Sequence, residues 1–179
     1  MRMSKKIRDM AYIALFAVLM AVCSWISVPT LVPFTMQTFA LFLCFGLLGG
    51  RRTVLAVLVF QLMGAVGLPV FSGFTGGVGH LFSAAGGFLL GFLAGALVMW
   101  LLERLIGRQS WAAGLAMLAG LTVCYGFGAA WLLLVYARTA GAAGLGTILL
   151  LYVVPYIVPD LVKLALALLL RRRLAPLMR

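Results

Sequence analysis

An acid and a base inside the last apolar segment are the residues best suited to do chemistry. Asp160 and Lys163 are three positions apart, which places both side chains on one helix face within contact distance. Asp160 lies 11 residues before Arg171, roughly 16 Å along a helix and near the middle of a membrane. Each charge costs at least about 2.5–3.5 kcal/mol at that depth. The pair is either a self-neutralising structural couple or a polar floor for a ligand.

Two prolines immediately before this pair favour the ligand interpretation. Pro155 and Pro159 have no N–H group, so each leaves a helical carbonyl without its usual donor. Inside a membrane, such carbonyls persist only beside other protein groups or a polar cavity.

Other polar candidates are few. Gln37 begins the second apolar segment and is expected to point inward, toward either a neighbouring helix or a ligand. His80 is the only histidine, so a hydrogen bond within its loop is favoured over a ligand contact, and it has no partners for a metal site. The three cysteines stand in apolar runs without metal-binding spacing and are expected to be small core residues; they are Cys23, Cys44 and Cys124.

The catalytic inventory is nearly empty. The chain has three carboxylates and contains no catalytic triad, zinc motif or nucleotide-binding loop. We therefore expect neither an enzyme nor a bound cofactor or metal, and a binding or transport role fits better. Active transport would need energy from a partner or from an ion gradient.

The composition identifies the elements that hold these residues. The chain of 179 residues is 65% hydrophobic and 9% charged, whereas soluble domains are roughly 45–50% apolar and about 25% charged. The sequence predicts an all-α integral membrane protein, one domain over residues 1–179, with six transmembrane helices. Their approximate ranges are 10–28, 34–48, 53–68, 85–105, 111–136 and 147–170. The second and third are short for a membrane span, so they are either embedded among the others or extended by flanking residues.

Basic residues predict the orientation of these helices. Twelve of the 14 lysines and arginines fall in the N-terminal tail, after the second segment, after the fourth and after the sixth. The alternate connections hold one, Arg138. By the positive-inside rule, this division predicts an even number of spans with both termini in the cytoplasm. The net charge of +11 then reflects orientation rather than nucleic-acid binding.

The outer connection over residues 69–84 is unusual for a solvated loop. It is rich in glycine, holds three phenylalanines and carries no formal charge. Glycine permits close approach of the backbone. We expect this loop to fold back on the bundle and to cover a ligand pocket, or else to form a plug without a ligand.

Two series of small residues predict close helix packing. Gly87, Gly91 and Gly95 recur every four residues in the fourth segment, and packing within this protein is favoured for them. A second stripe, on the first segment, consists of Ala14, Ala17 and Ala21.

Five stretches occur in the order Tyr12-Ile-Ala-Leu-Phe-Ala, Thr35-Met-Gln-Thr, Gly67-Leu-Pro-Val-Phe-Ser-Gly-Phe-Thr-Gly-Gly-Val-Gly, Gly86-Gly-Phe-Leu-Leu-Gly-Phe and Pro159-Asp-Leu-Val-Lys. Together they resemble the BioY family, the biotin-binding S components of energy-coupling factor (ECF) transporters. The resemblance runs from about residue 10 to residue 171. It implies a six-helix bundle in the bacterial plasma membrane that binds biotin near its extracytoplasmic side.

The resemblance also implies partners and site residues. The partners are a transmembrane coupling protein and two ATP-binding cassette subunits, with the alanine stripe as the docking surface. The implied substrate-binding residues are Asp160, Lys163, Gln37, Tyr152, Phe71, Gly73, Phe74, Gly77, Gly79 and His80. Biotin suits them: Asp160 can accept from the ureido N–H groups, aromatic rings can pack the apolar part, and Lys163 can meet the tail carboxylate or hold Asp160.

One stretch departs from the family pattern. Where the family has Gly-Pro-Thr-Gly-Gly-Tyr, this chain has Ser83-Ala84-Ala85-Gly86-Gly87-Phe88. An S component for another small vitamin is therefore the first alternative. An intramembrane enzyme and a purely structural membrane subunit are the others.

Overall fold

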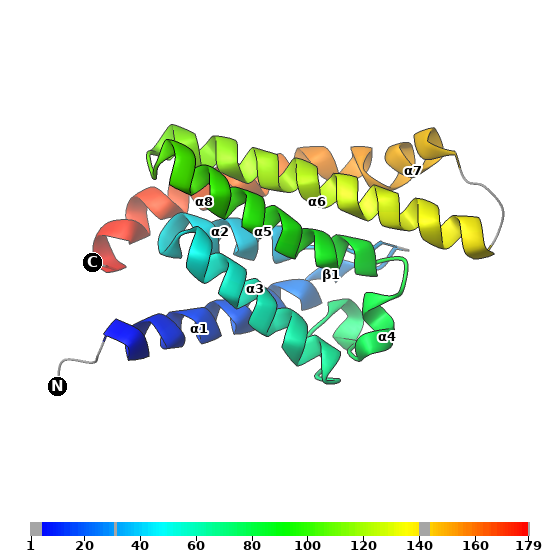
Figure 1. The fold of residues 1–179 in the computed structure, drawn as a ribbon, viewed down its shortest axis with the longest axis horizontal. Coiled ribbons are helices and arrows are strands. Elements are labelled where there is room, and N and C mark those ends of the chain that lie inside the picture. The colour runs from blue at the N-terminus through cyan, green and yellow to red at the C-terminus, as the bar shows by residue number, and fades with distance from the viewer. Residues whose placement is uncertain (1–4, 31, 140–143, 179) are drawn as a thin grey trace.

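The computed structural model describes residues 5–30, 32–139 and 144–178, and these are mostly helical (Figure 1). The α-helices are α1 (Lys5–Trp25), α2 (Gln37–Leu48), α3 (Gly50–Ala65), α4 (Val78–Leu81), α5 (Gly86–Ile106), α6 (Ser110–Thr139), α7 (Leu145–Tyr152) and α8 (Val154–Leu174). Short 3-10 turns occur at Ser72–Phe74 and Ala175–Met178. Two short strands, β1 (Ser27–Val28) and β2 (Phe34–Thr35), pair antiparallel between α1 and α2.

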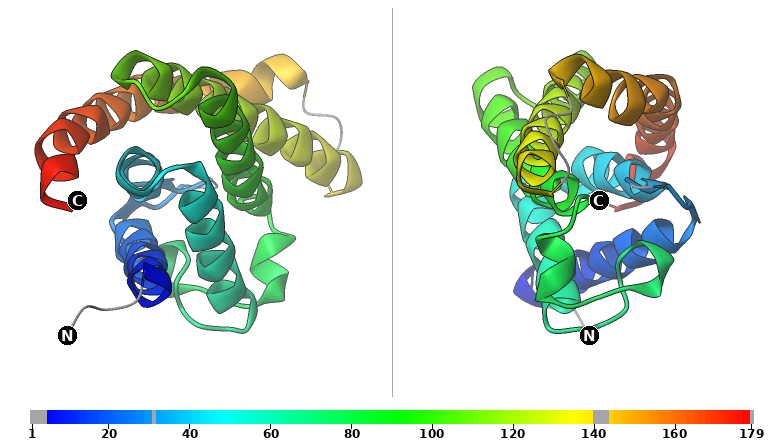
Figure 2. Two further views of the ribbon diagram at one scale, coloured as in Figure 1. Left: turned by 60° about the vertical axis from the view of Figure 1, so that its left-hand side comes forward. Right: turned by 90° about the vertical axis from the view of Figure 1, so that its right-hand side faces the viewer.

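Helix α2 lies at the centre of the bundle. Ten of its 12 residues are buried, and it packs against α1, α3, α5 and α8. Figure 2 shows α5, α6 and α8 arching over one side of α2, with α1 and α3 on the other. Twelve helical residues extend about 18 Å, less than the roughly 30 Å hydrocarbon core. Of the two alternatives for the short second segment, embedding among the other helices or extension by flanking residues, this burial favours the first.

Helices α5 and α6 approach closely along the predicted glycine series. A Cβ atom at Gly91 would lie 2.9 Å from the Cys124 carbonyl oxygen, and one at Gly95 would lie 2.6 Å from that of Gly120. Gly87 faces the Trp131 side chain in the same way. Packing within this protein is therefore confirmed for these three glycines.

The last predicted helix, 147–170, is not continuous in the structure. The structure divides it at Val153 into α7 and α8, which are bent by 42°. Val153 has backbone angles of φ −125° and ψ −57°, and Pro155 occupies the first turn of α8. Proline cannot donate to the preceding turn but suits a helix start, so a break just before it is the expected response.

Within the described residues, three helical stretches are long and apolar enough to cross a membrane, and the bent pair α7–α8 makes a fourth if it is counted as one span. The three are α1, α5 and the stretch Ser110–Val135 of α6. These stretches agree with a multi-pass membrane protein. The count of six spans stays a prediction.

The basic clusters gather at one end of the bundle. The start of α1, the end of α8 and the two tight turns α2–α3 and α5–α6 all lie at that end (Figure 1). Arg51 and Arg52 lie in the first turn of α3, Arg104 lies in the last turn of α5, and Arg108 follows in the connection to α6. The β1–β2 hairpin and α4 lie at the opposite end (Figure 1).

At that opposite end, the glycine-rich connection folds back on α1 and α3. The Phe71 ring is 1% exposed and sits over Gly64, where a Cβ atom would lie 2.0 Å from the ring. The Trp25 indole N–H donates to the Pro69 carbonyl (2.9 Å), and the Trp25 ring stacks on Phe74. The connection is thus tied to the bundle by packing and by hydrogen bonds.

The alanine stripe on α1 does not form a surface. Ala17 and Ala21 are 0% and 3% exposed because they pack inside this chain, and Ala14 is exposed. This corrects the expectation that all three alanines face a partner. The apolar side chains that α1 does expose include Leu15, Val18 and Val22.

Candidate substrate-binding site

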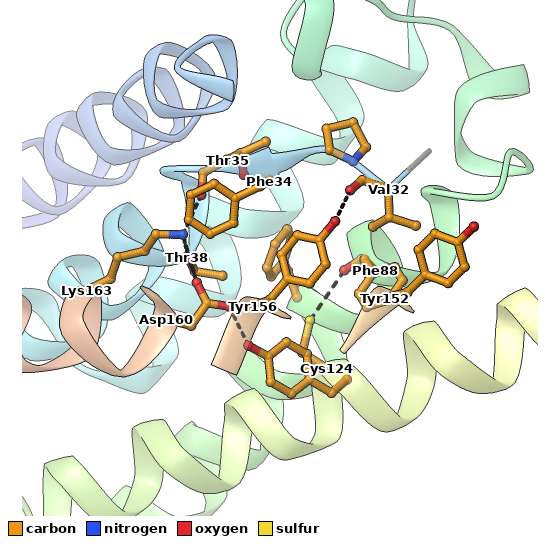
Figure 3. A pocket seen from close by; sticks show the side chains of 13 residues that line it. Val32, Phe34, Thr35, Thr38, Phe88, Cys124, Tyr152, Tyr156, Asp160 and Lys163 are labelled. Atoms are coloured by element: carbon orange, nitrogen blue, oxygen red, sulfur yellow. Dashed lines mark hydrogen bonds and ion pairs between the residues drawn. The ribbon is translucent and has the colours of Figure 1, made fainter. Parts of the chain in front are cut away.

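A cavity lies beside the acid–base pair, enclosed by α2, α5, α6 and α8 and roofed by the hairpin strand β2 (Figure 3). Its empty volume is about 410 Å³, including the space at its mouth. The lining residues are Val32, Pro33, Phe34, Thr35, Thr38, Phe88, Phe92, Cys124, Tyr125, Tyr152, Tyr156, Asp160 and Lys163.

Asp160 and Lys163 form a buried ion pair at the floor of this cavity. Their side chains are joined by a 2.8 Å contact between Lys163 Nζ and Asp160 Oδ1, and the two residues are 4% and 3% exposed, respectively. Thr38 on α2 binds both: its hydroxyl donates to Asp160 Oδ1 at 2.8 Å and accepts from Lys163 Nζ at 3.1 Å. The helix spacing predicted the contact between the two charges, and that prediction is confirmed.

Asp160 and Lys163 differ in how many hydrogen-bonding positions each has left for a ligand. Lys163 Nζ has three protons and three partners: Asp160 Oδ1, Thr38 Oγ1 and the Thr35 carbonyl at 2.6 Å. Asp160 Oδ2 accepts from the Tyr125 hydroxyl at 2.6 Å. Within the described residues that is one donor for an oxygen that can take two. The acid therefore has a free acceptor position, whereas the base has its donors occupied.

The roof of the cavity is held by the same groups and by Tyr156. Lys163 Nζ lies 3.9 Å from the centre of the Phe34 ring, a cation–π contact, and donates to Thr35 in the same strand. The Tyr156 hydroxyl donates to the Val32 carbonyl at 2.6 Å (Figure 3). Helix α8 thus supplies both the floor and the attachments of the roof.

A second, smaller cavity adjoins the first. Its empty volume is about 350 Å³, and it shares a wall with the first that consists of Val32, Pro33, Thr35, Phe88 and Phe92. Gln37, Ser72 and His80 add polar groups. Burial lowers the pKa of His80 from its ordinary value, which favours the uncharged ring. His80 also stacks on Phe71, and its Nδ1 lies 3.2 Å from Thr75 Oγ1.

The structure distributes the predicted substrate-binding residues over three places. Asp160, Lys163 and Tyr152 line the first cavity, and Gln37 and His80 line the second. The others lie in the folded-back connection: Phe71 packs against Phe60 and Gly64, Phe74 stacks on Trp25, and the glycines are Gly73, Gly77 and Gly79.

The glycines of this connection serve its backbone. Gly73 and Gly77 have φ angles of 69° and 98°, which side-chain-bearing residues rarely adopt. Ser72 and His80 are the residues by which the connection reaches the second cavity. That the connection covers a ligand stays a prediction, as does the binding role of its residues.

Sequence reasoning missed several groups that complete the site. Tyr125 and Tyr156 are polar residues inside apolar segments, and each buried hydroxyl there needs a partner. That requirement was a usable signal for both tyrosines, as it was for Thr38. The short hairpin gave no such signal, because its pairing depends on contacts with α8 that are far away in sequence.

The site can hold a small, mostly apolar ligand that carries N–H donors. Asp160 Oδ2 offers the acceptor, while Phe88, Phe92 and Tyr152 offer aromatic and apolar walls. Among the described residues, no group of three His, Cys, Asp or Glu side chains is placed to hold a metal ion.

Comparison with known proteins gives consistent results over the whole length. The sequence model of the BioY family matches residues 1–179. A biotin transporter BioY of Thermotoga maritima is 38% identical over 172 residues, covering 95% of this chain and 97% of that protein. A probable biotin transporter BioY of Pyrococcus horikoshii is 35% identical over 170 residues, covering 94% and 97%.

A solved structure has the same fold. It is the crystal structure of the S component for biotin from an ECF-type ABC transporter, with a TM-score of 0.83 and 22% sequence identity. The match covers 96% of this chain and 94% of that one.

Proposed function

Because the chain belongs to the BioY family, we propose that it captures biotin as the S component of an ECF-type ABC transporter. The family is one of transporter components, not enzymes. Biotin is then the transported substrate, and no cofactor takes part. The names of the relatives and the fold of the biotin S component support this assignment.

The observation that carries the proposal is the free acceptor position on Asp160 in a mostly apolar cavity. Biotin has a ureido ring with two N–H donors, an apolar thiophane ring and a carboxylate tail. A ureido N–H can bond Asp160 Oδ2 beside Tyr125, and hydrogen bonds to a charged acceptor are the stronger kind. Phe88, Phe92 and Tyr152 then contact the apolar parts.

In this proposal Lys163 positions groups rather than binding the tail carboxylate. Its three protons are engaged with Asp160, Thr38 and Thr35. It pairs with the Asp160 side chain and holds the roof strand over the ligand. The tail can extend toward the second cavity, where Gln37 and Ser72 supply hydrogen-bond donors.

We further propose the complete membrane arrangement. A single domain with six membrane-embedded segments lies in the bacterial plasma membrane, with both termini in the cytoplasm and the cavity near the outer surface. The gathering of Arg51, Arg52, Arg104 and Arg108 at the end opposite the hairpin supports this orientation.

Direct measurement of bound ligand tests the proposed substrate. Native mass spectrometry of gently extracted protein is expected to detect biotin, and calorimetry of the purified, biotin-free chain is expected to give high affinity for biotin within a panel of small vitamins. Tighter binding of another vitamin would contradict the assignment. Chemical conversion of the bound ligand by the protein would contradict a transport function altogether.

A second candidate, an S component for another vitamin, rests on one specific observation. Ala85, in the stretch that departs from the family pattern, lines the second cavity, and Ser83 beside it bonds the His80 carbonyl at 2.7 Å. The departure therefore alters the place we assign to the ligand tail. The same panel separates this candidate from biotin.

The partners of this subunit are proposed to be a transmembrane coupling protein and two ATPase subunits, docked on the exposed face of α1. Ala14 lies on that face near Leu15 and Val18. Replacing Ala14 by Trp is expected to lower biotin uptake by cells that contain all subunits at least about fivefold, because a bulky ring prevents close helix approach. Biotin binding to the isolated chain should be unchanged.

The matched control is Ala130→Trp, an equally bulky change on the exposed surface of α6. Uptake should remain normal in that variant. Normal uptake in the Ala14 variant would refute docking through this face of α1.

A further inference from the structure

A groove of mixed charge lies at the end of the bundle that holds the start of α1. It has an empty volume of about 1,370 Å³, including the space at its open side. It is formed by the first turns of α1, the α2–α3 turn and the end of α5. The lining residues are Lys6, Asp9, Met10, Ile13, Leu48, Gly49, Gly50, Arg51, Arg52, Leu55, Glu103, Arg104 and Arg108.

The groove has a surplus of positive charge. Five basic side chains line it, against the two carboxylates of Asp9 and Glu103. Asp9 pairs with Arg52 at 2.8 Å, and Glu103 pairs with Arg108 at 2.7 Å. The surplus comes from the three other basic residues, Lys6, Arg51 and Arg104. A ligand that matches this groove therefore carries negative charge.

One wall of the groove is rigid. The Gly50 N–H donates to Glu103 Oε2 at 2.6 Å, which fixes the start of α3 to α5. A Cβ atom at Gly50 would lie 2.4 Å from Trp100 Cα, so these backbones are in close contact. The Arg104 guanidinium rests 4.4 Å from the centre of the Trp100 ring. This contact places the Arg104 side chain along the wall of the groove.

The floor of the groove is apolar. Met10 and Leu55 are 62% and 39% exposed, and they lie beside Ile13 and Leu48 in the lining. Cations at the rim and an exposed hydrocarbon floor together suit an amphiphile better than a fully hydrated ion. The groove also lies where apolar helices end in basic residues, the depth at which lipid headgroups lie.

We propose that this groove binds the phosphate headgroup of an anionic glycerophospholipid. Lys6, Arg51 and Arg104 contact the phosphate, and the first part of an acyl chain covers Met10 and Leu55. This groove shares no lining residue with the cavity beside Asp160, so the proposal of a lipid site does not depend on the proposal of biotin capture.

Lipid titration of the purified full-length chain in neutral detergent tests this proposal. Phosphatidylglycerol is expected to raise the thermal unfolding temperature and to remain bound in native mass spectrometry, whereas phosphatidylcholine does neither. The double variant Lys6→Gln/Arg51→Gln should bind phosphatidylglycerol roughly 30-fold more weakly, at about fivefold for each basic residue near the membrane surface.

The matched control removes two positive charges outside the groove lining. Arg8 and Arg173 are both exposed, and Arg8→Gln/Arg173→Gln should change the affinity less than about threefold. An equal loss in both double variants would overturn the proposal in favour of diffuse attraction. Equal stabilisation by inorganic phosphate, or by phosphatidylcholine, would overturn it as well. If the groove double variant does not fold, Lys6→Gln alone should show the fivefold loss.

Discussion

Replacing Asp160 by Asn is expected to weaken biotin binding by roughly 10- to 150-fold. The substitution keeps the shape of the side chain but removes the charge that strengthens an accepted N–H bond, and bonds to charged groups contribute about 1.5–3 kcal/mol. It also leaves the Lys163 ammonium buried without its counter-ion. Calorimetric titration of the purified chain with biotin measures the loss.

Asp9→Asn is the matched control for this change. Asp9 pairs with Arg52 in the basic groove, far along the bundle from the cavity. Biotin affinity should change less than about twofold in this variant. Unaltered affinity in the Asp160 variant would refute the polar floor that we assign to the ligand.

Replacing Lys163 by Met is expected to destabilise the protein by about 3–5 kcal/mol, because removing one partner of a buried ion pair leaves an uncompensated charge. The thermal unfolding temperature should fall by on the order of 10 °C. The roof strand also loses its bond at the Thr35 carbonyl. Thermal unfolding in detergent, followed by tryptophan fluorescence, measures the change.

The double variant Asp160→Asn/Lys163→Met separates structural support from ligand binding. Neutralising both partners removes the stranded charge, so most of the lost thermal stability should return. Biotin binding should not return, because the charged acceptor is absent. Recovery of both properties would mean that the ion pair supports only the fold. Recovery of neither would mean that Thr38 and Tyr125 cannot accommodate the neutral pair.

Helices could be predicted from the sequence where a long run of apolar residues determines them. The first five predicted helices match the described ones to within a few residues, because long apolar runs in lipid must satisfy their own backbone. The spacing of Asp160 and Lys163 predicted their contact, and the burial of Gln37 agrees with its predicted inward direction. The break at Val153 was harder to predict because a proline can be accommodated either at a kink or at a new helix start.

Features that depend on packing between segments far apart in the sequence could not be predicted from the sequence. The alanine stripe on α1 has the pattern of a contact surface, but the pattern does not say whether the contact is internal; Ala17 and Ala21 turned out to be internal. The bonds from Tyr125 to Asp160 and from Tyr156 to Val32 join residues 35 and 124 positions apart. Such pairs depend on how α6, α8 and the hairpin meet, and no local spacing encodes that.

All three N–H groups of the Lys163 ammonium have hydrogen-bond partners, and this affects how a ligand can bind in the cavity. A ligand that accepts a hydrogen bond from Lys163 Nζ must displace one of its three present partners. One of these partners is the Thr35 carbonyl in β2, the strand that roofs the cavity. Binding through Lys163 would therefore exchange one hydrogen bond for another, whereas binding through Asp160 Oδ2 would add one. A ligand that bonds only to Asp160 leaves the hydrogen bond between Lys163 Nζ and the Thr35 carbonyl intact, so β2 stays attached over the cavity.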